Sequence, residues 1–185
     1  MVKKYNNNQI TFKDVITFNL DEYVGLDKNN INSYHYYMYD NLFNHIDIDK
    51  NNIHIPEDVN KYKEELKKYD IDLMILGLGQ NGHIGFNEPG KEFVRQTHIV
   101  NLSENTKEVN SKLFKKDKIP DQAITIGIED IFKAKKILIM VSGKSKKKIV
   151  KQLLYSDITP TLPATILLLH SDCTLIVDKD AIEES

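Results

Sequence analysis

The sequence predicts a three-layer α/β domain with a mostly parallel sheet and helices on both faces of that sheet. Its length of 185 residues fits one domain, and 41% of these residues are hydrophobic, which is enough to form a core. Short apolar runs rich in β-branched residues alternate with helical patterns along the chain. Such alternation is typical of βαβ units joined by right-handed crossovers.

Five apolar runs have the length and composition of strands. The run at 73–76 is apolar throughout, as expected for a parallel strand that is covered on both faces. The predicted strands are 15–19, 73–76, 123–126, 137–141 and 174–177.

Helical patterns separate these strands. Ser33 is a suitable N-cap for the first pattern, and Tyr62 and Leu66 share one face of the second, which is otherwise rich in Lys and Glu. Ser103 and Thr106 form a partial capping box at the start of the third, where Thr replaces the usual Glu or Gln. The predicted helices are 33–43, 59–69, 103–114 and 145–154.

Composition and charge exclude several classes of protein. The 25 Lys and Arg nearly balance the 27 Asp and Glu, and a net charge of −2 argues against a protein that coats nucleic acid. No apolar run approaches the roughly 18–20 residues of a membrane helix, and the first residues lack the apolar segment of a secretory signal. The sequence therefore predicts no nucleic-acid or membrane partner.

Cysteine content points to the compartment. The single cysteine, Cys173, excludes an internal disulfide and a cysteine-based zinc site, and its apolar neighbours favour a core thiol. The composition therefore predicts a single domain over residues 1–185 in a reducing compartment, the cytoplasm.

The loops that follow the predicted strands are the candidate site, because ligands of parallel sheets bind outside the C-terminal ends of the strands. Asp21 comes directly after the first predicted strand and has apolar neighbours. Desolvation there would raise the pKa of its carboxyl group, as a general base requires. The alternative is an N-cap or a surface acid in a loop.

The loop after strand 73–76 begins with the G-x-G-x-x-G spacing of a dinucleotide-binding turn, at 77–82. Such a turn must open a long helix, whereas Gly85 and Pro89 would break one here. No acid follows a strand about 20 residues further on to hold a ribose, so the context argues against nicotinamide binding.

The same loop contains His83 and Glu88, with Asn81 beside them. A histidine near a carboxylate in a glycine-rich loop can shuttle protons, with the acid setting the tautomer of the imidazole. One His and one Glu are too few ligands for a metal site, so no metal is predicted. The alternative is a histidine that packs in a tight loop.

The loop after strand 137–141 contains Ser142 and Gly143 and leads into a lysine-rich helix that includes Lys146. It is not a Walker A phosphate loop, because Leu138 stands where that motif needs glycine. Backbone N–H groups at a helix start and one ammonium group are still suited to hold a phosphate. The alternative is a solvated basic helix face. Together the three loops predict proton transfer on a small phosphorylated substrate, with no metal or redox cofactor.

Two of these loops resemble the glucosamine-6-phosphate deaminase (glucosamine-6-phosphate isomerase) family. The resemblance rests on TFNLDEYVGL at 17–26, followed by Ser33-Tyr34, and on LGLGQNGHIGFNEP at 76–89. The similarity extends from about Ile10 onward, with further agreement at 106–114, 162–165 and 169–170. The closest competitor on the same fold, 6-phosphogluconolactonase, lacks the Phe-Asn-Glu-Pro ending of the second loop, which favours the deaminase.

The resemblance implies the conversion of glucosamine 6-phosphate and water to fructose 6-phosphate and ammonia. Asp21 matches the base that moves a proton between C2 and C1 through an enediol-type intermediate. His83 matches the residue that opens the pyranose ring, with Glu88 as its partner, and Lys146 matches the phosphate-binding lysine. Asn81 stands where one branch of the family has Asp and another has Asn. The Asn branch tends to lack the allosteric hexamer, and the sequence leaves a homo-oligomer open.

Two departures from the family pattern bear on activity. The family begins with a strand and a Gly/Ser/Thr-rich loop that helps to hold the phosphate, and no such segment precedes Ile10. A strand–loop–helix unit of about 30 or more residues is therefore predicted to be missing. Arg95, the candidate for a second phosphate contact, lies one position before the family's usual Arg, where this chain has Gln96. The expectation is strongly reduced deaminase activity or none, with a non-catalytic sugar-phosphate binder or an inactive fragment as the alternative.

Overall fold

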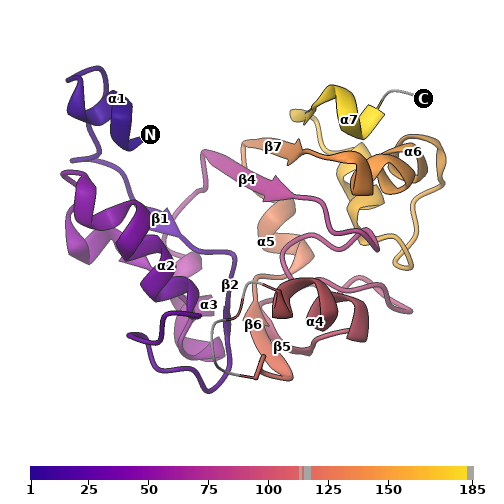
Figure 1. Ribbon diagram of the computed structural model, residues 1–185, viewed down its shortest axis with the longest axis horizontal. Coiled ribbons are helices and arrows are strands. Elements are labelled where there is room, and N and C mark those ends of the chain that lie inside the picture. The colour runs from indigo at the N-terminus through magenta and orange to yellow at the C-terminus, as the bar shows by residue number, and fades with distance from the viewer. Residues whose placement is uncertain (113, 115–117, 183–185) are drawn as a thin grey trace.

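The structure, a computed structural model, describes residues 1–112, 114 and 118–182, and Figure 1 shows how they are arranged. The α-helices are α1 Val2–Asn6, α2 Tyr34–Asn41, α3 Val59–Leu66, α4 Glu104–Ser111, α5 Ile128–Phe132, α6 Lys147–Tyr155 and α7 Lys179–Ile182. The strands are β1 Thr17–Phe18, β2 Asp21–Tyr23, β3 Ile53–His54, β4 Leu73–Gly77, β5 His98–Asn101, β6 Gln122–Thr125, β7 Lys136–Val141 and β8 Cys173–Val177. Short 3₁₀ helices lie at Phe43–His45, Lys50–Asn52, Lys144–Lys146 and Pro163–Leu169.

The described strands form three sheets. One contains parallel strands in the order β4–β7–β8, with Ile75 opposite Leu138 and Leu138 opposite Thr174. Strands β1 and β3 pair in parallel in a second sheet. Strands β2–β6–β5 pair antiparallel in the third. The parallel strands and the helices that connect them confirm the predicted α/β class.

All five predicted strands are present, but one of them pairs in the opposite direction from that expected. The segment predicted at 123–126 is β6, which is antiparallel to both of its neighbours, β2 and β5. A run of apolar residues indicates a strand but not the direction of its partners, because strands of both kinds can be buried on both faces. The sequence missed β2, β3 and β5, since these strands have two to four residues and include polar side chains such as Asp21 and His98.

The four predicted helices are present: the first three have shorter bounds, and the fourth ends one residue later than predicted, at Tyr155. The hydroxyl oxygens of Ser33 and Ser103 accept hydrogen bonds from the backbone N–H groups of Tyr36 and Thr106, which confirms both N-caps. The third helix, predicted at 103–114, includes position 113, which lies outside the described residues. The fourth begins as a 3₁₀ turn after Gly143, whose φ of +89° favours glycine.

The hydrophobic core lies on one face of the β4–β7–β8 sheet. Leu76 and Ile139 on this face pack in a cluster with apolar side chains of α3, α5 and α6. On the other face the large side chains of these three strands are exposed or only partly buried, so among the described residues helices cover one face of this sheet. A smaller cluster around Tyr23, Phe86 and Ala123 joins the antiparallel sheet to the loop after β4, beside α4 (Figure 1).

Neither α6 nor any other described helix is long and apolar enough to cross a membrane.

Candidate active site

A cavity of about 260 Å³ opens where β4 and β7 end and where the chain passes from β1 into β2. Asp21, His83 and Lys146 all line it, and each comes from a different one of the three loops singled out in the sequence. Strands β4 and β7 pair in parallel, so the loops after them meet at one edge of their sheet. Strand β1 belongs to a different sheet, and tertiary packing brings Asp21 to the same place. Helix α4 also lines the cavity, through Asn105, Thr106, Val109 and Asn110.

The Asp21 carboxylate lies in a crowded position at the cavity. Asp21 is the first residue of β2 and pairs with Thr125 of β6. A side chain at Gly85 would bring its Cβ within 3.5 Å of Asp21 Oδ2, and the φ of Gly85 is +58°, so glycine permits this close approach. Burial raises the pKa of Asp21 from 3.8 to about 7, and the negative charge of Glu22 adds to this effect. A carboxyl group with this pKa is suited to act as a base near neutral pH.

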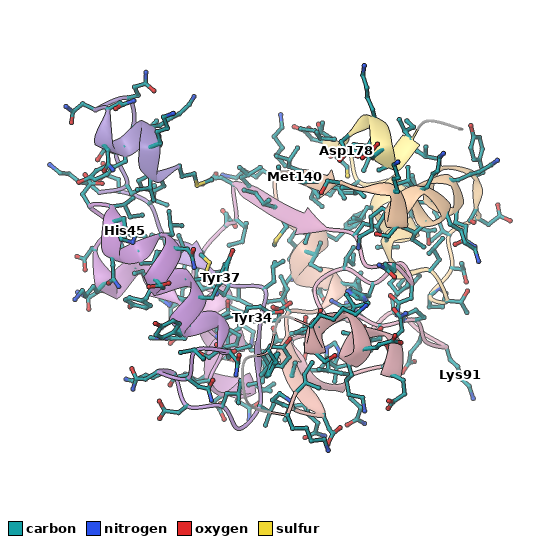
Figure 2. The ribbon with its side chains drawn as sticks, in the orientation of Figure 1. Tyr34, Tyr37, His45, Lys91, Met140 and Asp178 are labelled. Carbon is teal, nitrogen blue, oxygen red and sulfur yellow. The ribbon has the colours of Figure 1, made fainter. Side chains whose placement is uncertain are left out.

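Glu22, the next residue, is buried, and its carboxylate is bound by backbone N–H groups. Its carboxylate accepts hydrogen bonds from the N–H groups of Tyr23 at 2.8 Å, Tyr34 at 3.0 Å and His35 at 2.7 Å. Two of these donors belong to the first turn of α2, where backbone N–H groups have no partner within the helix. Tyr34, labelled in Figure 2, marks this end of α2. Glu22 therefore ties β2, and with it Asp21, to the start of α2.

His83 and Glu88 form the predicted pair. The imidazole Nδ1 of His83 lies 3.6 Å from Glu88 Oε2, and Asn81 Nδ2 donates a hydrogen bond of 2.8 Å to the same oxygen. The other oxygen, Oε1, accepts hydrogen bonds from the hydroxyls of Thr106 at 2.5 Å and Ser103 at 3.1 Å. Burial alone would raise the pKa of Glu88, but the interaction with the nearby His83 imidazole and the hydrogen bonds from Thr106 and Asn81 outweigh it and lower this pKa to about 2. The carboxylate is therefore charged at neutral pH.

The backbone at Gly79 makes room for the His83 ring. A Cβ at Gly79 would lie 2.4 Å from ring atoms of His83, which no side chain could tolerate without moving the imidazole. The N–H of Gly79 also donates to the carbonyl oxygen of His83 at 2.9 Å. The glycine spacing that suggests a dinucleotide turn thus serves to hold a histidine against the loop backbone.

The third loop contributes one of its three predicted phosphate ligands to the cavity. Lys146 Nζ donates a hydrogen bond of 2.5 Å to the carbonyl oxygen of Leu78, and burial lowers the pKa of its ammonium group. The N–H of Gly143 instead donates to both carboxylate oxygens of Asp178, at 3.0 and 3.1 Å, and neither Ser142 nor Gly143 lines the cavity.

Arg95 is the other predicted ligand that the structure places away from the cavity. Its side chain is 79% exposed and forms an ion pair of 3.2 Å with Glu129. The sequence did not predict β5, the strand that follows Arg95, and β5 is not one of the strands that end at the cavity. The position of Arg95 in the sequence therefore could not show that its side chain lies away from the cavity.

Several residues at the site were missed in the sequence. Ser103 and Thr106 were recognised only as a helix cap, yet both hydroxyls also bind Glu88. Asn110 of α4 donates to the hydroxyl oxygen of Tyr23 at 3.1 Å, and so joins α4 to the strand of Asp21. The cap pattern and the family agreement at 106–114 were the available signals, and neither indicates that α4 lies against the loop after β4.

The fold and this cavity define an α/β protein equipped for proton transfer on an anionic small molecule, with a base, a histidine–carboxylate pair and a cation in one place. The profile described as glucosamine-6-phosphate isomerases/6-phosphogluconolactonase matches residues 1–176. The chain belongs to this family.

Named relatives agree with this assignment. The chain is 47% identical to the glucosamine-6-phosphate deaminase of Thermoanaerobacter sp. (strain X514), over 98% of this chain and 76% of the relative. It is 45% identical to the glucosamine-6-phosphate deaminase of Oceanobacillus iheyensis, over 100% of this chain and 78% of the relative. This chain therefore spans about three quarters of the length of these relatives.

Solved structures agree as well. A monomeric glucosamine-6-phosphate deaminase superposes with a TM-score of 0.94 at 40% identity, over 97% of this chain and 79% of that one. The 6-phosphogluconolactonase of Thermotoga maritima has a TM-score of 0.71 at 20% identity, over 95% of this chain and 79% of that one, which shows a shared fold alone.

Proposed function

We propose that this chain converts glucosamine 6-phosphate and water to fructose 6-phosphate and ammonia. The observation that carries this proposal is the meeting of Asp21, His83 and Lys146 on one cavity, in a chain 47% identical to a glucosamine-6-phosphate deaminase. The loop after β4 keeps the Phe-Asn-Glu-Pro ending at 86–89 that distinguishes the deaminase from the lactonase.

Each group then has a part in the reaction. The ammonium group of Lys146 binds the phosphate of the substrate. His83 moves a proton from the C1 hydroxyl to the ring oxygen, which breaks the C1–O5 bond and opens the pyranose. Glu88 holds the imidazole in position for this step.

Asp21 then carries out the isomerisation. Its carboxylate takes the proton from C2 of the open aldose and returns a proton to C1. In the same change the C1 carbonyl oxygen gains a proton and the amine nitrogen loses one, so C1 becomes a CH2OH group and the C2 amine becomes an imine. Water adds to C2 of the imine and ammonia leaves, so the product is the ketose phosphate. A dehydrated carboxylate held close to C2 suits this abstraction from carbon.

The test is the release of ammonia and the formation of fructose 6-phosphate from glucosamine 6-phosphate by the purified chain. Asp21→Asn serves as the inactive control, and 6-phosphogluconolactone is offered in parallel. Ammonia release that Asp21→Asn removes would support the proposal. Binding of glucosamine 6-phosphate without turnover would favour a non-catalytic binder, and hydrolysis of the lactone alone would favour the lactonase.

Several expectations from the sequence remain predictions. These are the cytoplasmic location, the absence of a cofactor, the phosphate contacts of Ser142, Gly143 and Arg95, and a single domain over residues 1–185, while the sequence left a homo-oligomer open. The solved relative named above is described as monomeric.

A further inference from the structure

Two buried polar side chains connect the strand of Asp21 to the loop of His83. Thr125 is the last residue of β6 and is 0% exposed, and Asn87 lies in the loop after β4 and is 5% exposed. Neither is among the residues that line the cavity. Burying a polar side chain costs free energy unless it finds hydrogen-bond partners, so these partners indicate what each side chain does.

Thr125 faces Asp21 across the antiparallel pair of β2 and β6, which lie side by side in Figure 1. Next to this pair, the N–H of Ile126 donates a hydrogen bond of 2.9 Å to the carbonyl oxygen of Leu20. In an antiparallel ladder, the position beside a hydrogen-bonded pair has no backbone hydrogen bonds across it, and its two side chains lie close together on one face of the sheet. The Thr125 hydroxyl therefore lies on the same face as the Asp21 carboxylate.

The same hydroxyl also binds the loop that contains His83. Its oxygen accepts a hydrogen bond of 3.0 Å from the N–H of Phe86. A Cβ at Gly85 would lie 3.0 Å from Thr125 Oγ1 and 3.5 Å from Asp21 Oδ2. The loop backbone thus passes directly against both side chains, and the Thr125 hydroxyl holds it there.

Asn87 provides a second link between the loop and the end of β6. Its Nδ2 donates hydrogen bonds to the carbonyl oxygens of Ile126, at 2.8 Å, and Ile84, at 3.0 Å. The N–H of the same Ile126 binds Leu20, directly before β2. Residues 125–126 therefore hold the strand of the base on one side and the loop of the histidine on the other.

We propose that Thr125 is a positioning residue, whose hydroxyl fixes the distance between His83 and Asp21. This inference rests on the proposed function, in which one sugar must reach His83 at its ring oxygen and Asp21 at C2. Strands β2 and β4 belong to different sheets, so pairing between strands does not set this distance. A displacement of about 1 Å between reacting groups can lower a rate by about 10²-fold, so a loosened loop should slow turnover.

The experiment compares two substitutions at Thr125. Thr125→Val keeps the shape of the side chain and removes the hydroxyl, whereas Thr125→Ser keeps the hydroxyl. We expect Thr125→Val to lower kcat by about tenfold or more and to change KM by less than about twofold, because Lys146 still binds the phosphate. Thr125→Ser should keep kcat within about threefold of the wild type. Asn87→Ala removes the second link and should show the same pattern, so it provides the test if Thr125→Val does not fold.

Thr165→Val is the matched control for the loss of a buried hydroxyl. Thr165 is also 0% exposed, and its hydroxyl accepts a hydrogen bond of 2.9 Å from the N–H of Thr159 and donates one of 2.7 Å to the carbonyl oxygen of Leu162. It is not among the residues that line the cavity. We expect Thr165→Val to lower Tm as much as Thr125→Val does, and to keep kcat within about twofold of the wild type.

Deuterium at C2 of the substrate identifies the step that is slowed. A sugar displaced from Asp21 loses its C2 proton more slowly, so the isotope effect on kcat in Thr125→Val should be as large as in the wild type or larger. A smaller isotope effect would overturn the proposal, because another step would then be the slower one. A kcat that Thr125→Val leaves unchanged, or a fall in kcat that Thr165→Val shows equally, would overturn it as well.

The wild type separates a failure of this inference from a failure of the proposed function. A wild type that releases no ammonia contradicts the proposed function. A wild type that turns over, with a kcat insensitive to Thr125→Val, overturns this inference alone. In either case, hydrogen exchange at the Phe86 amide, which should be faster in Thr125→Val than in the wild type, tests the hydrogen bond without reference to activity.

Discussion

The imidazole Nδ1 of His83 lies 3.6 Å from Oε2 of Glu88, on a carboxylate whose second oxygen is held by the hydroxyls of Ser103 and Thr106. Glu88 is thus fixed from both sides, by its own loop and by α4. The cost of burying this carboxylate is offset by its hydrogen bonds, which keep it ionised and keep the imidazole in one orientation.

Glu88→Gln should lower both activity and stability. We expect kcat/KM to fall by about 10- to 100-fold, because the neutral amide holds the imidazole less firmly in place for ring opening. The pKa of Glu88 is 4.5 when unperturbed and about 2 in the folded chain, so its charge stabilises the fold fully above pH 4.5. This contribution is lost as the pH falls toward 2.

Thermal unfolding of wild type and Glu88→Gln between pH 3 and pH 6 measures whether the charge of Glu88 stabilises the fold. The difference in Tm should be larger at pH 6 than at pH 3. An equal difference at both values would show that the carboxylate is not stabilised by its partners. Asn81→Ala, which removes one donor to Glu88, provides a milder version of the same change.

Asp21→Asn should abolish exchange of the C2 proton with solvent and lower kcat by about 10²- to 10⁴-fold, since the amide cannot accept that proton. The measurement is deuterium incorporation from D₂O, followed by NMR. Exchange that persists in the variant would show that another group is the base.

The same substitution should raise stability, and more so at high pH. The pKa of Asp21 rises from 3.8 to about 7 on folding, so between these values the folded chain holds a proton that the unfolded chain has lost. Stability relative to the Asn variant therefore falls as the pH rises from about 4 to 7. The gain in Tm from Asp21→Asn should be greater at pH 8 than at pH 5.

Glu22→Gln should move the pH profile of the reaction. Burial is the main cause of the raised pKa of Asp21, and the charge of Glu22 adds to it, so Glu22→Gln should shift the acidic limb of kcat/KM to lower pH than in the wild type. Glutamine keeps one of the two side-chain oxygens, so the N–H group of either Tyr34 or His35 loses its acceptor, which should cost about 1–3 kcal/mol of stability. A lower Tm with an unmoved acidic limb would leave Glu22 with a structural role alone.

Asp178→Ala should weaken substrate binding with little change in kcat. Asp178 accepts hydrogen bonds from Gly143 and from Ala181 at 2.9 Å, and so fixes the turn that leads to Lys146. We expect KM to rise several-fold and stability to fall by about 1–2 kcal/mol, as for the loss of a helix cap. Steady-state kinetics with Asp178→Asn as the conservative control measures this. An unchanged KM would mean that the position of Lys146 does not depend on this turn.

Three residues that line the cavity, Asp21, His83 and Lys146, could be named as candidates from the sequence. A loop that follows a strand can be located by the strand alone, so the sequence could place His83 and Lys146 together after β4 and β7, which pair in parallel. Asp21 follows β1, which belongs to another sheet, so its place beside them depends on tertiary packing. Ser142 and Arg95 show the limit of that reasoning. Both lie near suitable positions in sequence, but Arg95 pairs with Glu129, and the turn at Ser142 and Gly143 is held by Asp178.

The sequence by itself determined five of the strands and four of the helices in their order, the helix caps at Ser33 and Ser103, and which loops form the candidate site. These properties depend on local patterns of apolar residues and on neighbours three or four positions away. Tertiary structure decided that β6 is antiparallel, that Thr106 binds Glu88, and that Ile75 and Met140 are left exposed. Each of these depends on which distant segments meet, and burial, hydrogen bonding and pKa are set by those neighbours in space.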